Sequence, residues 1–393
     1  MDNFIYYAPT KVYFGKEQEN NIGKLIKEYH PHKVLIHYGM GSVIKSGLLL
    51  KVERLLENED IQYICLGGVK PNPDLDLVRE GIALAKKEGV DFILAIGGGS
   101  VLDSGKDIAN GLANPEDDVW DYHLGNKKPQ KTTHKACILT ISAAGSEMSD
   151  SSVISNYKTQ VKKGYGSPFN RFDIAIENPE LTYSVSPYQT ACGVVDIGMH
   201  TIERYFALGS GSELTDSIAE GIIKNIFICG KQCIDNPIDY EARANMMWAS
   251  SLSHNGLTGC GRSFLLTVHQ LEHVLSAVYP DVAHGAGLAA LWCSWARYVH
   301  KDAHERFIKY ARNVWLIEEK DEEKAVLEAI DRQEKYYQDI GMPTSLEELD
   351  VKYEDLENMA LKCSLNKSRI IPGYKPLGYQ EILDIYRLAY HKK

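Results

Sequence analysis

The sequence predicts an α/β fold: a Rossmann-like N-terminal domain with a parallel sheet, followed by an all-α C-terminal domain. Two observations carry this prediction. In the first 180 residues, short β-branched runs alternate with amphipathic helical stretches, which is typical of a parallel sheet covered by helices. From Ser186 onward, long stretches follow the helical period and strand-like runs almost disappear. We therefore expect the domains to span residues 1–185 and 186–393.

Four apolar runs are the predicted strands of the sheet. They are KVLIHYG at 33–39, IQYICLG at 61–67, DFILAIG at 91–97 and KACILTI at 135–141. Ser186 and Pro187 predict the start of the first long helix of the second half, because a serine hydroxyl caps free backbone N–H groups and proline tolerates the first helical position. This start places the domain boundary near residue 185.

Composition narrows the classes of partner. The 393 residues are 44% hydrophobic and 24% charged, with a formal net charge of −10 and no Lys/Arg block longer than a pair. Nucleic acid and anionic membranes attract basic patches, so we expect neither as a partner and expect a small molecule instead. The first residues lack the features of a secretory signal, and no stretch reaches the roughly 18 apolar residues that span a bilayer. The expected location is the cytoplasm.

A glycine-rich turn between a strand and a helix predicts an anion site. Gly97, Gly98 and Gly99 let the backbone approach a ligand, and Ser100 with Asp103 forms an S-x-x-D capping pattern that places a helix start directly after them. Free N–H groups and the helix dipole would hold a pyrophosphate there. The pattern matches neither standard nucleotide motif, so a merely structural turn stays an alternative.

A second glycine turn follows the first complete strand, at Gly39, Met40, Gly41 and Ser42. In dinucleotide folds an acidic residue at such a strand end holds the ribose hydroxyls of the adenosine. Here no carboxylate is present and Lys45 follows, so the turn would accept a 2′-phosphate, with Ser42 and backbone N–H groups as donors. The sequence therefore favours NADP(H) over NAD(H).

Four residues of the second half predict a metal site. Asp196 and His200 are four apart in an apolar helical stretch, so they project from one face. His269 lies in another such stretch, and His284 precedes two glycines and a small-residue helix, where close packing would bring it inward. One carboxylate and three imidazoles suit Fe²⁺ or Zn²⁺, whereas Mg²⁺ and Ca²⁺ prefer more oxygens. The alternative is that these are hydrogen-bonded core residues.

His273 lies one helical turn beyond His269 and so would lie beside the metal site. By spacing alone it is either a ligand or a proton carrier. We favour the proton carrier, since four ligands are already named and an imidazole titrates near neutral pH.

These stretches resemble the iron-containing, or group III, alcohol dehydrogenases, and among them the butanol dehydrogenase-like, NADPH-dependent aldehyde reductases. The matching segments are GGGSVLDSGKDIA, GSEMSDSSVIS, NPELTYSVSPYQTACGVVDIGMHTIERYF, LEHVLSAVYPDVAHGAGLA and KPLGYQEILDIYRLA. They span nearly the full length in the family's order. The resemblance implies an NADP(H)-linked alcohol dehydrogenase or aldehyde reductase acting on short-chain aldehydes and primary alcohols such as butanal and butanol, and a homodimer.

The resemblance also carries residues over by motif position. It implies metal ligation by Asp196, His200, His269 and His284, and places His273 near the nicotinamide. Gly98, Gly99, Ser100 and Asp103 match the pyrophosphate loop, and Asn72, Thr140 and Lys162 match further positions that contact the cofactor. NAD-preferring members of the wider family have an aspartate at the position of Gly39.

Three departures from the family pattern have predicted consequences. The segment TISAAGSEM lacks the usual proline and threonine, so a cofactor hydroxyl contact would be lost or move to Ser142. Met40 replaces a glycine, which a contact through its backbone alone would tolerate. His269 and His284 are 15 residues apart, one more than the family pattern, which predicts a bulge near Tyr279 and Pro280.

Three other functions compete with this interpretation. A lyase resembling dehydroquinate synthase would need a basic pocket, yet no Lys/Arg cluster surrounds the predicted ligands in the sequence. An NAD-dependent polyol oxidoreductase resembling glycerol dehydrogenase would have a different ligand pattern. A non-catalytic nucleotide or metal sensor would have no reason to keep the whole ligand set and both glycine turns.

Overall fold

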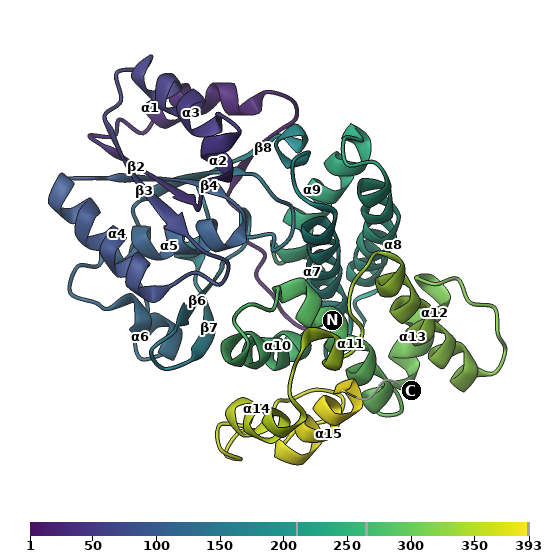
Figure 1. Cartoon of the computed structure of the whole chain (residues 1–393). Helices are drawn as coiled ribbons and strands as arrows, with labels where there is room; N and C mark the ends of the chain where they lie inside the picture. Colours follow the sequence, from purple (N-terminus) through teal and green to yellow (C-terminus); the bar gives the residue numbers. More distant parts are fainter. Residues whose placement is uncertain (210, 264–265, 391–393) are drawn as a thin grey trace. The chain divides into compact units, whose positions relative to one another are not determined.

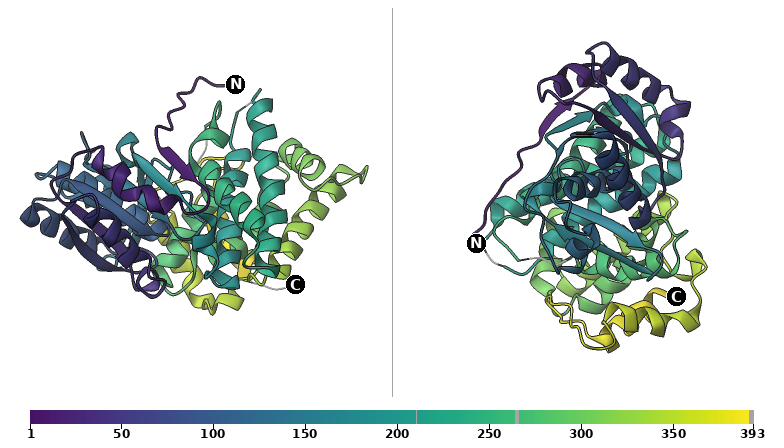
Figure 2. Two further views of the ribbon diagram at one scale, coloured as in Figure 1. Left: turned by 90° about the horizontal axis from the view of Figure 1, so that it is seen from above. Right: turned by 90° about the vertical axis from the view of Figure 1, so that its left-hand side faces the viewer.

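The computed structural model describes residues 1–209, 211–263 and 266–390, and its chain forms two compact units. Tyr7–Val185 form an α/β unit, and the residues from Ser186 onward form a helical unit that also includes Met1–Tyr6. The N-terminal arm joins the helical unit through contacts such as the hydrogen bond from Asp2 N to Gly261 O, at 3.0 Å. Figure 2 shows this arm as an extended segment that leads into the first strand.

The α/β unit is built on a parallel six-stranded sheet in the order β1-β8-β5-β4-β2-β3. Its strands are β1 (Lys11–Phe14), β2 (Val34–Gly39), β3 (Tyr63–Val69), β4 (Phe92–Gly97), β5 (His134–Leu139) and β8 (Ile174–Glu177). The four strands predicted from the sequence are confirmed, and every neighbouring pair in the sheet is parallel. The predicted Rossmann-like fold class is therefore confirmed for this unit.

Helices cover both faces of the sheet (Figure 1). One face packs on α1 (Ile22–Lys27), α2 (Ser42–Lys45) and α3 (Leu48–Glu57); the other packs on α4 (Leu75–Glu88), α5 (Gly99–Ala113) and α6 (Val119–Leu124). Residues along β2 alternate between the two apolar clusters, with Val34 and Ile36 in one and Leu35 in the other. This alternation explains why buried parallel strands have continuous apolar runs.

Some elements were not predicted from the sequence. Strands β1 and β8 are short, with four residues each, and β1 lies at the sheet edge. A separate antiparallel hairpin joins β6 (Ser151–Asn156) to β7 (Val161–Gly166). The hairpin is polar and glycine-containing, so its sequence lacks the apolar alternation that marks a strand. Short 3-10 helices complete the unit at Gln18–Asn21, Pro168–Asn170 and Pro179–Thr182.

The helical unit contains α7 to α15, and the paired strand residues described in it form isolated bridges only. The helices are α7 (Pro187–Tyr205), α8 (Glu213–Asp235), α9 (Tyr240–His254), α10 (Thr267–Val278), α11 (His284–Val299), α12 (His304–Asn313), α13 (Glu322–Asp339), α14 (Leu356–Cys363) and α15 (Tyr379–Tyr390). Further 3-10 helices lie at Leu257–Gly259, Glu347–Leu349 and Tyr353–Asp355. Ser186 caps α7, as predicted, with its hydroxyl accepting from Gln189 N at 3.2 Å. Among the described residues, no helix has the length and apolar character needed to cross a bilayer.

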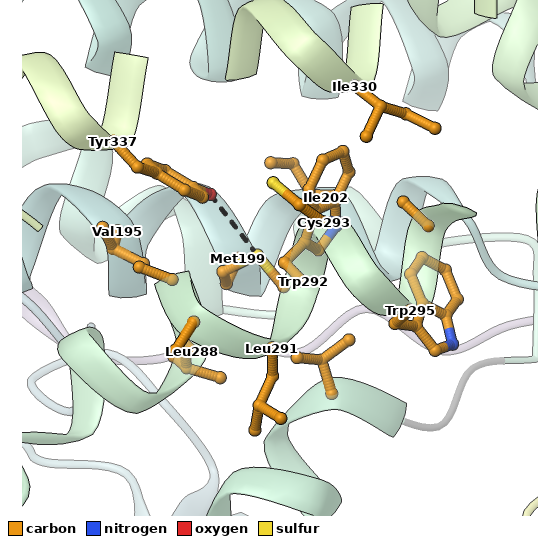
Figure 3. Packing of buried hydrophobic residues seen from close by; sticks show 14 of the residues in the cluster. Val195, Met199, Ile202, Leu288, Leu291, Trp292, Cys293, Trp295, Ile330 and Tyr337 are labelled. Atoms are coloured by element: carbon orange, nitrogen blue, oxygen red, sulfur yellow. Dashed lines mark hydrogen bonds between the residues drawn. The ribbon is translucent and has the colours of Figure 1, made fainter. Parts of the chain in front are cut away.

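The core of this unit packs α7 against α11 and α13. Figure 3 shows Met199 of α7 in contact with residues of both partners, and the hydroxyl of Tyr337 lies 3.7 Å from its sulfur. Trp292 of α11 is fully buried in the same cluster. Because α7 carries two of the predicted metal ligands and α11 begins at a third, this packing fixes their distance.

Glycines set how closely α11 approaches its neighbours. A Cβ added at Gly285 would lie 2.2 Å from the carbonyl oxygen of Cys192 in α7, and one at Gly287 would lie 2.9 Å from Cγ of Glu272 in α10. Real Cβ atoms do not approach backbone that closely, so α11 can begin here only with glycine at 285. The chain reaches this point through the residues between Val278 and His284, which form a turn between two helices. Tyr279 and Pro280, where the sequence predicts a bulge, lie in this turn outside both helices; that the turn contains an extra residue stays a prediction.

Gly285→Ala should destabilise the protein by about 1–3 kcal/mol, because the added methyl group overpacks the backbone of α7. Gly221→Ala is a matched control in α8, where an added Cβ meets nothing within 4 Å. The control should be neutral or stabilise by up to about 1 kcal/mol, as expected for Gly→Ala in a helix. Chemical denaturation of both variants measures the difference. Equal free energies of unfolding would contradict the close contact between α7 and α11.

Candidate functional site

The carboxyl ends of the parallel strands bring both predicted glycine turns to one edge of the sheet. After β2 the chain goes to β3 on one side, and after β3 it crosses to β4 on the other side of β2. The turns after β2 and β4 therefore flank the point where the strand order reverses, which is where ligands bind in open α/β sheets. Gly39 ends β2, Met40 is 70% exposed, and Ser42 begins α2.

The turn after β4 leads directly into α5, but its cap differs from the prediction. Helix α5 begins at Gly99, its N-cap is Gly98, and no side chain caps it. Ser100 is inside the first turn, so the predicted S-x-x-D capping pattern is wrong. The first N–H groups of α5 thus have no side-chain cap, which keeps the helix N-terminus suited to an anion. A Cβ at Gly98 would lie 2.2 Å from Cγ2 of Ile141, so glycine is required there by close packing.

Asp103 has another structural task. Its carboxylate accepts from Ser146 Oγ at 2.6 Å and from Val153 N at 2.9 Å, and it lies 3.2 Å from Lys106 Nζ. These contacts tie α5 to β6, the first strand of the hairpin. Lys162 lies on β7, the second strand of the same hairpin. The polar face of α5 thus fixes the hairpin that carries Lys162.

The remaining predicted cofactor residues lie in loops that follow strands. Thr140 follows β5 and its N–H donates to Gly97 O at 3.0 Å, which joins this segment to the glycine turn. Ser142 is buried two residues further on. Asn72 lies between β3 and α4 with a φ of 57°, and its carbonyl accepts from the hydroxyl of Tyr157 at 2.8 Å. The contacts of these residues with a cofactor stay predictions.

In the helical unit, the four predicted metal ligands converge. One oxygen, Oδ1 of Asp196, lies 3.6 Å from Nδ1 of His200, 3.4 Å from Nε2 of His269 and 3.7 Å from Nε2 of His284. The ligand atoms of Asp196, His200 and His269 all lie within 4.8 Å of one another. The rings of His200 and His269 are stacked, with centroids 4.6 Å apart.

The pKa values of His200 and His269 are shifted in opposite directions. Burial, helped by the neighbouring His254 and His269, holds the pKa of His200 well below its usual range. Burial acts the same way on His269, but the carboxylates of Glu203 and Asp196 outweigh it and raise the pKa of His269 to about 9. His200 is therefore neutral, while metal-free His269 retains a proton between two carboxylates.

His284 and His273 lie on the more exposed side of this group. His284 is the first residue of α11 and its side chain is 25% exposed. The His273 ring centroid lies 5.8 Å from that of His284 and 6.4 Å from that of His269. Glu272, His273 and His284 form a second group whose ligand atoms lie within 4.8 Å of one another. His284 thus faces Asp196 through Nε2 and Glu272 through Nδ1.

Two carboxylates that contact the predicted ligands were not predicted from the sequence. Glu203 accepts a hydrogen bond from Nδ1 of His269, and Glu272 accepts one from Nδ1 of His284. Their spacing was a usable signal: Glu203 is three residues after His200 and Glu272 is three after His269, each on the ligand face of an apolar helix.

The ligand atoms of Asp196, His200 and His269 fit a divalent metal ion, and His284 joins this group through its 3.7 Å approach to Asp196 rather than through mutual proximity to all three. In tetrahedral sites with bonds of about 2.0–2.1 Å, ligand atoms lie about 3.4 Å apart. The distances from Asp196 Oδ1 to the three imidazole nitrogens, 3.4–3.7 Å, agree with this spacing and exceed a good hydrogen bond. Nδ1 of His200 is also buried without a hydrogen-bond partner among the described residues. A buried ring nitrogen without such a partner is suited to bind a metal ion.

Comparison with known proteins identifies the family. Residues 9–179 match the model of the iron-containing alcohol dehydrogenases, and residues 190–390 match the C-terminal model of the Fe-containing alcohol dehydrogenase family. Similar proteins include NADH-dependent butanol dehydrogenase A of Clostridium acetobutylicum, 39% identical over 99% of this chain and 100% of that one. NADPH-dependent aldehyde reductase YqhD of Escherichia coli is 34% identical over 88% of this chain and 89% of that one.

The similarity extends to solved structures. The crystal structure of NADH-dependent butanol dehydrogenase A from Thermotoga maritima has a TM-score of 0.95 and 36% identity, covering 100% of this chain and 99% of that one. Both halves of the sequence and both units of the structure therefore agree with the resemblance found in the motifs. The chain belongs to the iron-containing alcohol dehydrogenase family of enzymes.

Proposed function

We propose that this protein is a metal-dependent, NADP(H)-linked alcohol dehydrogenase and aldehyde reductase that acts on short-chain aldehydes and primary alcohols such as butanal and butanol. The observation that carries the proposal is the convergence of three imidazole nitrogens on Oδ1 of Asp196. The activities for which the relatives are named, butanol dehydrogenase and aldehyde reductase, support this choice of substrates. The homodimer and the cytoplasmic location stay predictions.

Asp196, His200, His269 and His284 would hold the metal. The family description names iron, so we propose Fe²⁺; one carboxylate with three imidazoles also suits Zn²⁺. When bound, such an ion supplies Lewis-acid chemistry that polarises a carbonyl group and stabilises negative charge on its oxygen. The single carboxylate of this set leaves the ion a net positive charge, which favours that chemistry.

His273 is the proposed proton carrier. Its ring lies next to the His284 ring and is partly exposed, so water can reach it. As an imidazolium it would release a proton from a ring nitrogen toward the oxygen of the reduced product, through water or a ribose hydroxyl. In the direction of alcohol oxidation the same nitrogen would accept the proton.

The α/β unit would bind the dinucleotide. The uncapped N-terminus of α5 at Gly98–Ser100 would hold the pyrophosphate, and the turn from Gly39 to Ser42 would hold the adenosine ribose. Gly39 to Gly47 contain Lys45 and no carboxylate, which supports a 2′-phosphate and hence NADP(H). One of the relatives named above uses NADH and the other NADPH, so they do not decide the cofactor. The proposed preference for NADP(H) therefore rests on the charge of this turn.

Removal of the metal should abolish the reduction of butanal by NADPH, followed as the loss of NADPH absorbance. Fe²⁺ added under anaerobic conditions should restore it, and metal analysis should find about one ion per chain, as a single four-ligand site requires. Asp196→Ala should bind no metal, because it removes the atom on which the imidazoles converge. Full activity after complete metal removal would contradict the proposal.

His273→Gln should lower kcat about 10²- to 10⁴-fold, the usual contribution of a general acid or base. The metal content should stay that of the unmodified protein, since His273 is not one of the four ligands. His304→Gln, at a partly exposed imidazole of α12 that contacts Glu322, is the control and should leave kcat unchanged. Loss of metal in His273→Gln would indicate that His273 is a metal ligand and not the proton carrier.

Gly39→Asp should shift the preference from NADPH toward NADH. A Cβ at Gly39 would meet its nearest atom at 3.6 Å, an ordinary van der Waals contact, so the backbone there accepts a side chain. A carboxylate there would repel the 2′-phosphate, and kcat/KM for NADPH should fall by about 100-fold, since such like-charge contacts cost several kcal/mol. Gly39→Asn is the uncharged control and should change the ratio of kcat/KM for NADPH to that for NADH far less. If both variants keep that ratio, the turn does not bind the ribose.

A further inference from the structure

Two buried glutamates lie behind the imidazoles, on the side away from Asp196. Glu203 belongs to α7 and is 4% exposed; Glu272 belongs to α10 and is fully buried. Neither is among the four ligands of the proposed metal. Burial of a carboxylate costs free energy unless hydrogen-bond donors surround it. The donors around each glutamate therefore indicate its structural role.

Glu203 accepts three hydrogen bonds from the start of α10. Oε1 accepts from Val268 N at 2.5 Å, while Oε2 accepts from His269 N at 3.2 Å and from Nδ1 of His269. The N-cap of α10, Leu266, provides no side-chain cap. A carboxylate from α7 therefore caps α10 and holds the His269 ring at the same time. The positive end of the α10 dipole stabilises the negative charge of this carboxylate.

Glu272 accepts hydrogen bonds from both α10 and α11. One oxygen accepts from the hydroxyl of Ser276 and the other from Nδ1 of His284. Gly287 leaves the space that the Glu272 side chain fills. Glu272 thus ties the first residue of α11 to α10.

Both contacts fix the same property of the imidazoles. A carboxylate only accepts hydrogen bonds, so Nδ1 of each ring must carry the proton. The lone pair of the neutral ring is then on Nε2, the atom that faces Asp196 Oδ1 at 3.4 Å in His269 and 3.7 Å in His284. Carboxylates placed behind metal-bound histidines orient the ring and raise its basicity.

We propose that Glu203 and Glu272 are positioning residues of the metal centre, which set the tautomer of His269 and His284 and thereby the affinity for the ion. The inference rests on the proposed metal site. It deepens that proposal by giving two residues that are not ligands a role in setting the affinity for the metal.

The two glutamates should differ in their response to an uncharged replacement. In Glu203→Gln, either orientation of the amide turns an NH₂ group toward an N–H donor, because all three partners donate. In Glu272→Gln, the NH₂ group can face Ser276, whose hydroxyl also accepts, and the amide oxygen can still accept from His284. The first variant therefore disrupts the ring orientation, and the second preserves it.

The test measures the Kd of metal-free full-length protein for Zn²⁺, by competition with a chromophoric chelator. Glu203→Gln and Glu272→Ala should each weaken binding about 10- to 100-fold, the usual effect of losing such a partner. Glu272→Gln should bind within about threefold of the unmodified protein, since its hydrogen bond is kept. Glu220→Gln is the control: this buried carboxylate accepts from Tyr205 and Asn313, and its loss should not change the Kd.

Each outcome decides something different. If the unmodified protein does not bind Zn²⁺, the proposed metal site fails. If it binds and both Glu203→Gln and Glu272→Ala bind equally well, the positioning role is overturned. Equal weakening in Glu272→Gln and Glu272→Ala would overturn the tautomer argument. If Glu203→Gln does not fold, as shown by far-UV circular dichroism, the two Glu272 variants still decide, and the visible spectrum of bound Co²⁺ reports any altered geometry.

Discussion

The convergence of three imidazoles on one oxygen of Asp196 is the constraint on which the helical unit depends. The four side chains come from α7, α10 and α11, so these helices must meet at one point and at short distance. Gly285 allows α11 to reach the backbone of α7, and Gly287 leaves room for Glu272 beside α10. The apolar packing in Figure 3 holds α7 and α11 together behind this point.

The charges around this point explain why folding and metal binding should be coupled. Asp196, Glu203 and Glu272 place three buried carboxylates beside imidazoles that are neutral when they act as ligands. Burial of charge without compensation costs several kcal/mol for each group. Without metal, His269 compensates one of these charges, because its raised pKa keeps it protonated. A divalent cation compensates more of this charge, and its binding free energy adds to the stability of the fold.

The sequence alone is enough to predict those parts of the fold and site that depend on neighbouring residues. The four central strands, the cap at Ser186 and the pair Asp196–His200 are each encoded within a few neighbouring residues. The failures involve partners distant in sequence. The predicted cap of α5 failed because the helix already begins at Gly99, and Asp103 instead accepts hydrogen bonds from Ser146 and Val153, more than forty residues away. The spacing of Glu203 from His200 indicates only that it lies near the ligand face; its hydrogen-bond partners, 65 and 66 residues further along the chain, are not encoded locally.

The interval between His269 and His284, predicted to be one residue longer than in the family pattern, illustrates the same distinction. A residue inserted within a helix would rotate all later side chains by about 100°. Here the two histidines lie on different helices, and the residues between Val278 and His284 are a connection. The position of His284 is set by the contact of Gly285 with Cys192 and by the hydrogen bond to Glu272, both of which are independent of the length of that connection. The ligand geometry can therefore be kept while the connecting segment changes length.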